Sequence, residues 1–303
     1  MMREIKAVGL FATLLALGAV SLAASAQSPP VVFTLKQEGS GGGALSADGT
    51  KIAYVADDHS LRVVEIASRK ERVVWRPQYD VEVFRNPSFS PDGSHIVFEM
   101  GGATMHYPSE IYSVQVNGTD LRQLTHQSEP VQLQSPEGGY AGGRFFYTPR
   151  YSPDGSQILV WQSSEVSEGD QGDFAAVVSP SSSDVQVLTN GKPLGWAAGG
   201  KAIFVETDQC VGRYDLDSKA TKAVPGLRNA SVLGILRGSD IFAVGSNGWL
   251  GLVTVADTTA GPPKIILPLG TEITQVESDQ SRSYLLLRYE AELLEVLQIV
   301  KLK

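Results

Sequence analysis

The residues of this sequence whose types could form a metal site are histidines and the carboxylates next to them in the chain. His59, His106 and His126 belong to expected loops, and the first of them follows Asp57 and Asp58. Imidazole and carboxylate groups bind transition metals, but protein ligands for such metals usually occur at short, regular spacings. These histidines are widely separated and show no such spacing, so we expect no metal site and no cofactor. A shared metal site on these three histidines is the less favoured alternative.

The sequence contains none of the common patterns of covalent or phosphate chemistry. It has no nucleophile elbow, no Cys-His pair and no phosphate-binding loop, and the glycine-rich segment 39–43 precedes an expected strand. Cys210 is the single cysteine, so an intramolecular disulfide is excluded. It lies in an alternating apolar segment, where we expect a buried and unreactive thiol. We therefore assign no catalytic residue.

Aromatic and polar side chains are concentrated in segments that suit binding better than catalysis. Aromatic rings offer rigid contact area with a polar edge, and arginine pairs with carboxylates of a partner. Two segments carry most of these residues, the loop 101–109 and the long connection 126–148, and a third loop, 163–173, is acidic. The candidate partner-binding residues are His106, Tyr107, Gln132, Gln134, Tyr140, Arg144, Phe145, Phe146 and Tyr147.

A repeated turn sequence determines how these segments are positioned. Its clear copies are Ser-Ala-Asp-Gly at 46–49 and Ser-Pro-Asp-Gly at 90–93 and 152–155, and weaker copies lie near residues 199, 238 and 280. Proline fixes φ, aspartate accepts hydrogen bonds from the following backbone, and glycine adopts the positive φ of the turn. Short alternating strands flank each turn, and no amphipathic helix is evident. Six units of about forty residues with four strands each predict an all-β, six-bladed β-propeller.

We expect the two ends of the chain to close this ring together. The sixth unit lacks a fourth strand, and the segment 31–36 has the composition of one. We expect this N-terminal strand to pair with the last blade around 293–300, because a closed ring leaves no long exposed sheet edge. An open β-solenoid or two β-sandwiches are the alternatives.

The strand order of a propeller places the candidate segments together. The Asp-Gly turns lie on one face, here called the turn face, and the loops 101–109, 126–148 and 163–173 lie on the opposite face, here called the loop face. All three fall over blades two and three, which makes this region our candidate for a binding site. Alternatively, the aromatic residues at 145–147 fill the space between two blades, and the acidic loop is a solvated hairpin.

The repeat also resembles that of a known family. Ser-Pro-Asp-Gly, an alternating strand, an Ile-Tyr strand and Arg-Gln-Leu-Thr within 87–125 resemble the WD40-like repeat of TolB-like propellers. The resemblance is good at 45–67 and 149–161 and weak after Gly195. It implies a six-bladed propeller. TolB carries an additional α/β domain before its propeller, so the resemblance covers the propeller alone and implies no Tol-Pal role.

The first 26 residues have the features of a secretory signal peptide. Arg3 and Lys6 precede an apolar run, and Ala24-Ser25-Ala26 matches a cleavage site. We expect cleavage near Ala26, a periplasmic or secreted protein, and a single propeller domain over 27–303. An uncleaved membrane anchor is the alternative, but we expect no membrane insertion of the mature chain.

Charge and composition narrow the class of partner. The formal net charge is −8, which disfavours nucleic acid as a partner. We expect a monomeric binding protein that engages a protein or a cell-envelope component over blades two and three. The alternative function is a propeller enzyme, such as a metal-dependent hydrolase or lyase that acts on a sugar or phosphate ester.

Overall fold

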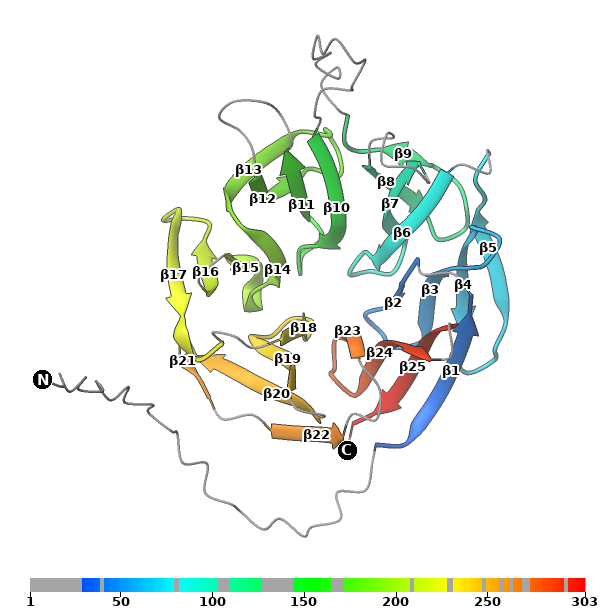
Figure 1. The fold of residues 1–303 in the computed structure, drawn as a ribbon. Coiled ribbons are helices and arrows are strands. Elements are labelled where there is room, and N and C mark those ends of the chain that lie inside the picture. Colours follow the sequence, from blue (N-terminus) through cyan, green and yellow to red (C-terminus); the bar gives the residue numbers. More distant parts are fainter. Residues whose placement is uncertain are drawn as a thin grey trace, which may run out of the picture.

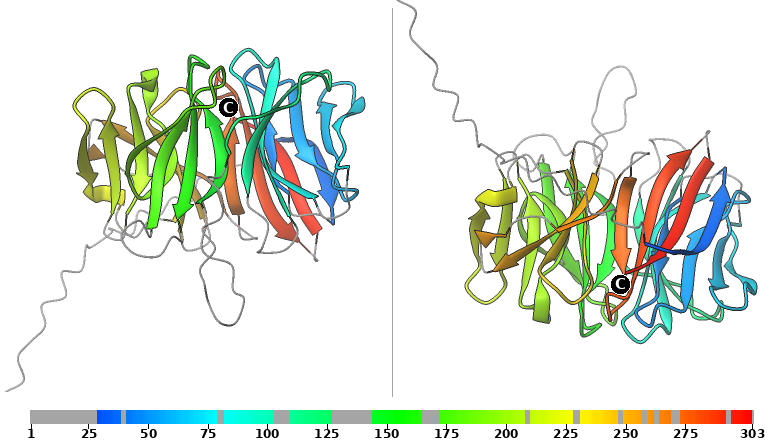
Figure 2. Two further views of the ribbon diagram at one scale, coloured as in Figure 1. Left: turned by 90° about the horizontal axis from the view of Figure 1, so that it is seen from above. Right: turned by 90° about the horizontal axis from the view of Figure 1, so that it is seen from below.

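The chain forms a ring of six antiparallel sheets around a central axis (Figure 1). Seen from the side, the ring is a flat disc with the strands running between its two faces (Figure 2). The computed structural model describes residues 29–38, 41–78, 82–102, 109–126, 144–164, 172–207, 210–227, 231–246, 249–256, 259–261, 264–268, 273–291 and 294–302.

The first three blades follow one another along the chain, each with its strands ordered outward from the axis (Figure 1). Blade one consists of β2 (Gly43–Leu45), β3 (Lys51–Val55), β4 (Leu61–Glu65) and β5 (Glu71–Trp75). Blade two consists of β6 (Glu82–Phe89), β7 (His95–Gly102), β8 (Glu110–Gln115) and β9 (Arg122–Gln123). Blade three consists of β10 (Arg144–Tyr151), β11 (Ile158–Ser164), β12 (Gly172–Val178) and β13 (Val185–Asn190).

The last three blades differ from one another at their outer edges. Blade four consists of β14 (Lys192–Trp196), β15 (Ala202–Glu206), β16 (Val211–Asp215) and β17 (Ala220–Val224). Blade five consists of β18 (Ser231–Ile235), β19 (Ile241–Ser246) and β20 (Trp249–Ala256), with β21 (Thr259–Ala260) and β22 (Lys264–Pro268) both paired to β20. Blade six consists of β23 (Ile273–Ser278), β24 (Tyr284–Ala291), β25 (Leu294–Lys301) and the N-terminal β1 (Val31–Gln37). The six four-stranded blades predicted from the repeat are confirmed, except that the outer edge of blade five is shared by two short strands.

The ring is closed by its N-terminal strand, as predicted. β1 pairs antiparallel with β25, with Leu35 opposite Leu297. Phe33 points inward and is buried with Leu286 and Ile299 between blades six and one. The pairing is reinforced by a buried hydrogen bond from the Gln37 amide to the Glu295 carboxylate.

The hydrophobic core lies between the blades rather than in the centre of the ring. Six clusters of buried apolar side chains occur in the described part of the chain, one at each junction of neighbouring blades. At the junction of blades two and three, for example, Phe146 packs with Ile111 and Ile158. This arrangement follows from the period-two pattern of the strands, which gives each sheet two apolar faces.

The Asp-Gly turns have the hydrogen bonds that their residue types predict. In the second copy, the Ser90 hydroxyl donates to Asp92 Oδ1 at 2.5 Å and the Ser94 backbone N–H donates to the same oxygen at 3.0 Å. Gly93 has the positive φ of 70°. These bonds, led by the one from Ser90, lower the pKa of Asp92 to about 2. Each such turn is therefore a rigid link between the inner two strands of its blade.

The described residues also include two short 3-10 helices. They are η1 (Ala198–Gly200), in the turn of blade four, and η2 (Pro225–Leu227), after β17. Within the described ranges, no helix is long and apolar enough to span a lipid bilayer.

Candidate functional site

The stems of the three predicted loops meet on the loop face. The Phe146 backbone N–H donates to Ser109 O at 2.9 Å, which joins the start of blade three to the loop stem of blade two. Arg144 pairs with Ser164 at the loop end of β10 and β11. The stems of the segments 101–109, 126–148 and 163–173 are therefore side by side. Five predicted residues, His106, Tyr107, Gln132, Gln134 and Tyr140, lie outside the described residues.

The start of β10 presents its aromatic residues to two different blades. Phe146 is 2% exposed and belongs to the core between blades two and three. Its assignment to the partner-binding set is therefore corrected, since a ring packed between blades has no surface to offer. Phe145 and Tyr147 point to the opposite side of the sheet, because side chains alternate along a strand. Both are half-buried.

Phe145 and Tyr147 form a continuous aromatic surface with Trp161 of β11. The Phe145 and Tyr147 rings are stacked with centroids 6.3 Å apart, and the Tyr147 and Trp161 centroids are 4.8 Å apart. Lys192 Nζ, at the start of blade four, lies 4.4 Å from the centre of the Trp161 ring. The Trp161 indole N–H donates to Asp173 Oδ1 at 2.7 Å. These five residues, here called the aromatic ladder, combine apolar rings with one positive and one negative group.

The sequence does not single out Trp161 or Lys192, and Asp173 is distinguished only as a member of the acidic loop 163–173. Trp161 directly follows the alternating strand of a clear repeat copy, so its place in the sequence is that of a framework residue and not of a loop residue. Its partner Tyr147 is cross-strand and directly opposite. Pairing the expected strands of blade three residue by residue would have placed the two rings together.

Two of the histidines considered as metal ligands are described, and they lie on different blades, His59 after β3 and His126 after β9. His59 and His126 are exposed, and His106 lies outside the described residues. In the described ranges, no three His, Cys, Asp or Glu residues are grouped so that they could hold a metal ion. Cys210 is partly exposed rather than fully buried.

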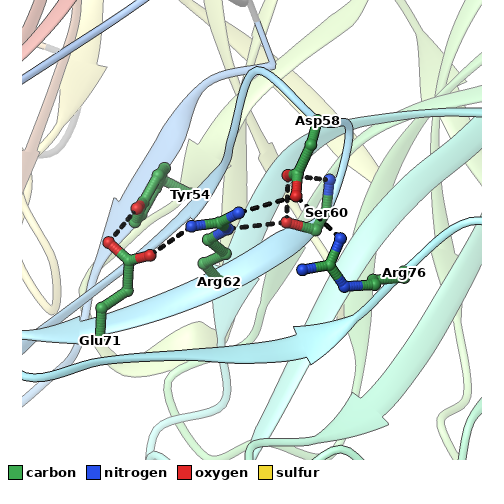
Figure 3. Close-up of polar contacts among 6 residues, drawn as sticks. All are labelled: Tyr54, Asp58, Ser60, Arg62, Glu71 and Arg76. Atoms are coloured by element: carbon green, nitrogen blue, oxygen red, sulfur yellow. Dashed lines mark hydrogen bonds and ion pairs between the residues drawn. The ribbon is translucent and has the colours of Figure 1, made fainter.

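Asp58, the carboxylate next to His59, belongs to an ion-pair network on blade one (Figure 3). Its Oδ2 accepts from Arg62 Nη2 at 2.7 Å and from Arg76 Nη1 at 2.9 Å. Arg62 Nη1 also contacts Glu71 Oε1 at 2.5 Å, and Glu71 accepts from the Tyr54 hydroxyl. The hydrogen bond from Ser60 and the arginine contacts lower the pKa of Asp58. This network links β3, β4, β5 and the connection to blade two, which is a structural role.

A second concave region lies on the turn face, where the central channel opens. A cavity of about 260 Å³ is bounded by inner strands and turns of five of the six blades. Arg150, from blade three, and Glu277, from blade six, meet across it with Nη2 and Oε1 3.3 Å apart. Arg237, from the turn of blade five, also lines it. Burial and the nearby Arg150 charge lower the pKa of Arg237, while Glu277 and Asp279 oppose the shift.

A groove of about 440 Å³ adjoins this cavity on the turn face. It lies between blades two and three and includes His95 and Arg122. Pro91 and Tyr151 line both the groove and the cavity. The two depressions are therefore neighbours, and both lie on the face opposite to the one favoured by the sequence analysis.

The chain was compared with known families, curated proteins and solved structures. No protein-family model matches it, and no curated protein matches it in sequence. Its fold is similar to that of TolB from Acinetobacter baumannii, with 15% identity, a TM-score of 0.58 and 84% of this chain aligned to 64% of that chain. The chain thus spans less than two thirds of that protein.

In two further similar structures, the alignment covers a larger share of the other chain. A protein assigned as TolB from Agrobacterium tumefaciens has 14% identity and a TM-score of 0.56, over 90% of this chain and 94% of that one. An oligogalacturonate lyase in complex with manganese has 12% identity and a TM-score of 0.56, over 86% and 76%. The predicted resemblance to a TolB-like six-bladed propeller is confirmed at the level of the fold.

Proposed function

We propose that this protein is a propeller scaffold that binds a protein or cell-envelope component through the loop face at blades two and three. The observation that carries the proposal is the aromatic ladder. Half-buried rings with a polar edge are typical anchors of protein interfaces, because they add contact area at little conformational cost. The ladder extends the surface to the edge of blade four, where Lys192 and Asp173 provide charged groups for orientation.

The framework supports this use because it holds the ladder rigidly. Tyr147 is paired with Trp161 across the sheet, and Phe146 anchors the same strand in the core. A preordered surface loses less entropy on binding than a flexible one. The remaining candidates, His106, Tyr107, Gln132, Gln134, Tyr140 and Arg144, complete the proposed surface from the neighbouring loops and the strand end.

We further propose that the mature protein is monomeric and works outside the cytoplasm, after cleavage near Ala26. The signal-peptide pattern of residues 1–26 supports export. The structural similarity to TolB is consistent with a periplasmic location. Edman sequencing or mass spectrometry of the protein secreted or released from the periplasm tests the cleavage site.

Affinity capture from cell-envelope extracts tests the binding surface. The mature chain is compared with Phe145→Ser/Tyr147→Ser, which removes two rings of the ladder. Tyr151→Ser is the matched control, because Tyr151 is on the same strand at the turn face. We expect the ladder variant to lose a partner that the control retains, with both variants folded by circular dichroism. Equal capture by the two variants would contradict the proposal.

A propeller enzyme is the second candidate function, favoured by the structural similarity to an oligogalacturonate lyase in complex with manganese. Metal analysis of gently purified protein, followed by assay of the metal-loaded chain on oligogalacturonate, tests it. Bound metal in stoichiometric amount with product formation would replace the scaffold proposal.

A further inference from the structure

One position on the inner strands explains the cavity at the turn-face end of the central channel. Each residue at this position pairs with a residue near the start of the strand that follows the turn. The residues are Ala44, Ser88, Arg150, Gly195, Gly234 and Glu277. Four of the six residues are small, and three of these, Ser88, Gly195 and Gly234, line the cavity. The two large ones come from blades three and six, which face each other across the ring (Figure 1), and form an ion pair.

The turns contribute a second charged group from an equally distinctive position. Pro91 and Pro153 line the cavity from blades two and three, while the corresponding turn residues of blades five and six are Arg237 and Gln280. The weak repeat copies of blades five and six thus differ from the Ser-Pro-Asp-Gly sequence at the turn position whose side chain lines the cavity. This placement indicates a specialised surface rather than simple loss of the repeat.

Arg237 is held in place by backbone groups of two other blades. Its Nη2 donates to Leu45 O of blade one at 3.0 Å, and its Nε contacts Ser278 O of blade six at 3.4 Å. Within the described part of the chain, these bonds use Nε and Nη2 and leave Nη1 available to a ligand. The guanidinium is therefore preorganised, with little side-chain entropy left to lose on binding.

The charges that line the cavity do not balance. Glu277 is already committed, since Oε1 accepts from Gln275 at 2.8 Å and Oε2 accepts from the Leu45 backbone N–H at 3.2 Å. Asp279 does not line the cavity; it also attracts Arg237 electrostatically, but its oxygens accept from the Tyr284 backbone N–H at 2.8 Å and the Ser281 backbone N–H at 3.2 Å within its own turn. Of the charged groups that line the cavity, one carboxylate thus faces two guanidinium groups in a partly desolvated space. Such a site favours one additional negative charge, because an unpaired charge is costly away from water.

The volume of the cavity and its apolar walls indicate the size and the chemical class of the ligand. The cavity is slightly smaller than the roughly 300–1,000 Å³ of typical drug-sized pockets, so its ligand is small. A dianion such as phosphate would leave an uncompensated charge, whereas a carboxylate matches both the charge and the planar fork of arginine. The apolar walls are formed by Leu194, Trp196, Val232, Leu233, Ile235 and Val276.

We propose that the turn-face mouth of the central channel binds a small organic monocarboxylate with an apolar body. Arg237 and Arg150 bind the carboxylate, and the apolar wall around Trp196 contacts the body of the ligand. This site is independent of the loop-face surface in the proposed function. A variant in the aromatic ladder therefore leaves it intact.

Titration followed by NMR of the mature chain tests the proposal. The probes are phenylacetate and hexanoate, each compared with its own primary amide, which has the same shape without the charge. The readout is the indole N–H signal of Trp196, identified by its loss in Trp196→Phe, because this group donates to Arg150 O at 3.0 Å. We expect a saturable shift with the acids and at least about tenfold weaker binding of the amides, equivalent to about 1.4 kcal/mol.

Charge variants make the test specific. Arg150→Gln should weaken phenylacetate binding at least about tenfold, and Glu277→Gln, which removes the competing carboxylate, should strengthen it by a similar factor. Arg85→Gln is the matched control, because Arg85 pairs with Glu99 on blade two and does not line the cavity. Three results would overturn the proposal. They are equal affinity for acid and amide, weaker binding by Glu277→Gln, and no shift up to about 10 mM of either acid. Specific ligands bind in the roughly 1 mM to 1 nM range, so the absence of a shift at about 10 mM would mean no specific binding.

Discussion

Closure of the ring by β1 makes a quantitative prediction about Phe33. Its side chain is 4% exposed and packs between blades six and one, where the Arg69 guanidinium also lies 5.3 Å from the ring centre. Phe33→Ala removes this ring from the core and leaves a cavity beside Leu286 and Ile299. The substitution thus weakens the only strand through which the N-terminal segment joins the described propeller.

The expected loss follows from the burial of the side chain. Phenylalanine-to-alanine changes in protein cores cost about 3–5 kcal/mol of unfolding free energy. Because β1 is the outermost strand of its blade, part of the cavity can collapse, and we expect about 3 kcal/mol. With a urea m-value near about 3 kcal/mol/M for a chain of this size, the unfolding midpoint falls by about 1 M.

Equilibrium urea unfolding of the mature chain, followed by tryptophan fluorescence and circular dichroism, measures this shift. Val31→Ala is the control, since Val31 is on the same strand but is 52% exposed and should change stability by less than about 0.5 kcal/mol. If Phe33→Ala is no more destabilising than Val31→Ala, β1 does not contribute to closure and the reasoning fails. Two separate unfolding transitions would likewise refute a single closed ring.

The other predictions concern pH and backbone packing. Because the Ser90 hydrogen bond and the neighbouring turn groups lower the pKa of Asp92 to about 2, its contribution to stability is complete above the unfolded pKa of about 3.9 and is lost as the pH falls through the folded value. Asp92→Asn should therefore flatten the fall in melting temperature between about pH 4 and pH 2, and an unchanged slope would show that the turn does not hold the charged form. Burial raises the pKa of Glu99, so its contribution has the opposite sign: it is present below the unfolded pKa and is lost as the pH rises through the folded one. Glu99→Gln should gain stability relative to the natural chain on going from about pH 4 to pH 7, as urea unfolding at both values would measure, and a relative loss would contradict the assignment. Gly234→Ala should cost about 2–3 kcal/mol, because a Cβ at this position would lie 2.1 Å from Val276 O of the next blade; a freely tolerated alanine in the same unfolding assay would mean that the inner strands of blades five and six are not so close.

The sequence predicts most of this fold because its repeat is local. Ser90, Asp92 and Gly93 each contribute a separate requirement of one turn, and the same residue types recur at 152–155. The period of the turns determines the number of blades, and the apolar segment 31–36 indicates the closing strand. The split outer edge of blade five was not predictable in the same way, because β21 has only 2 residues and neither β21 nor β22 belongs to the repeated turn sequence.

The candidate site was less predictable because it depends on pairing across strands. Phe145, Phe146 and Tyr147 are three consecutive aromatic residues, and the sequence alone does not distinguish a core position from a surface position among them. The register of β10 decides which of the three side chains enters the core. Trp161 and Lys192 are far apart in the sequence, and their contact depends on the junction of blades three and four. The positions of the loops in the sequence therefore indicate the region of the candidate site, but not which side chains are exposed there.

The weak repeats carry information that the strong repeats cannot. A turn with Pro91 or Pro153 is optimised for a rigid backbone and offers an apolar ring to the channel, whereas Arg237 offers a charge. Blade five retains the turn without the complete Asp-Gly sequence, since Gly238 has the positive φ of 63° and Leu236 retains the turn hydrogen bond to Ile241. The backbone requirement is thus met by one glycine, and the position before it is free to vary. In a ring of six similar blades, a site that needs asymmetry at the axis must arise from departures from the repeat, such as Arg237 in the turn of blade five and the pairing of Arg150 of blade three with Glu277 of blade six.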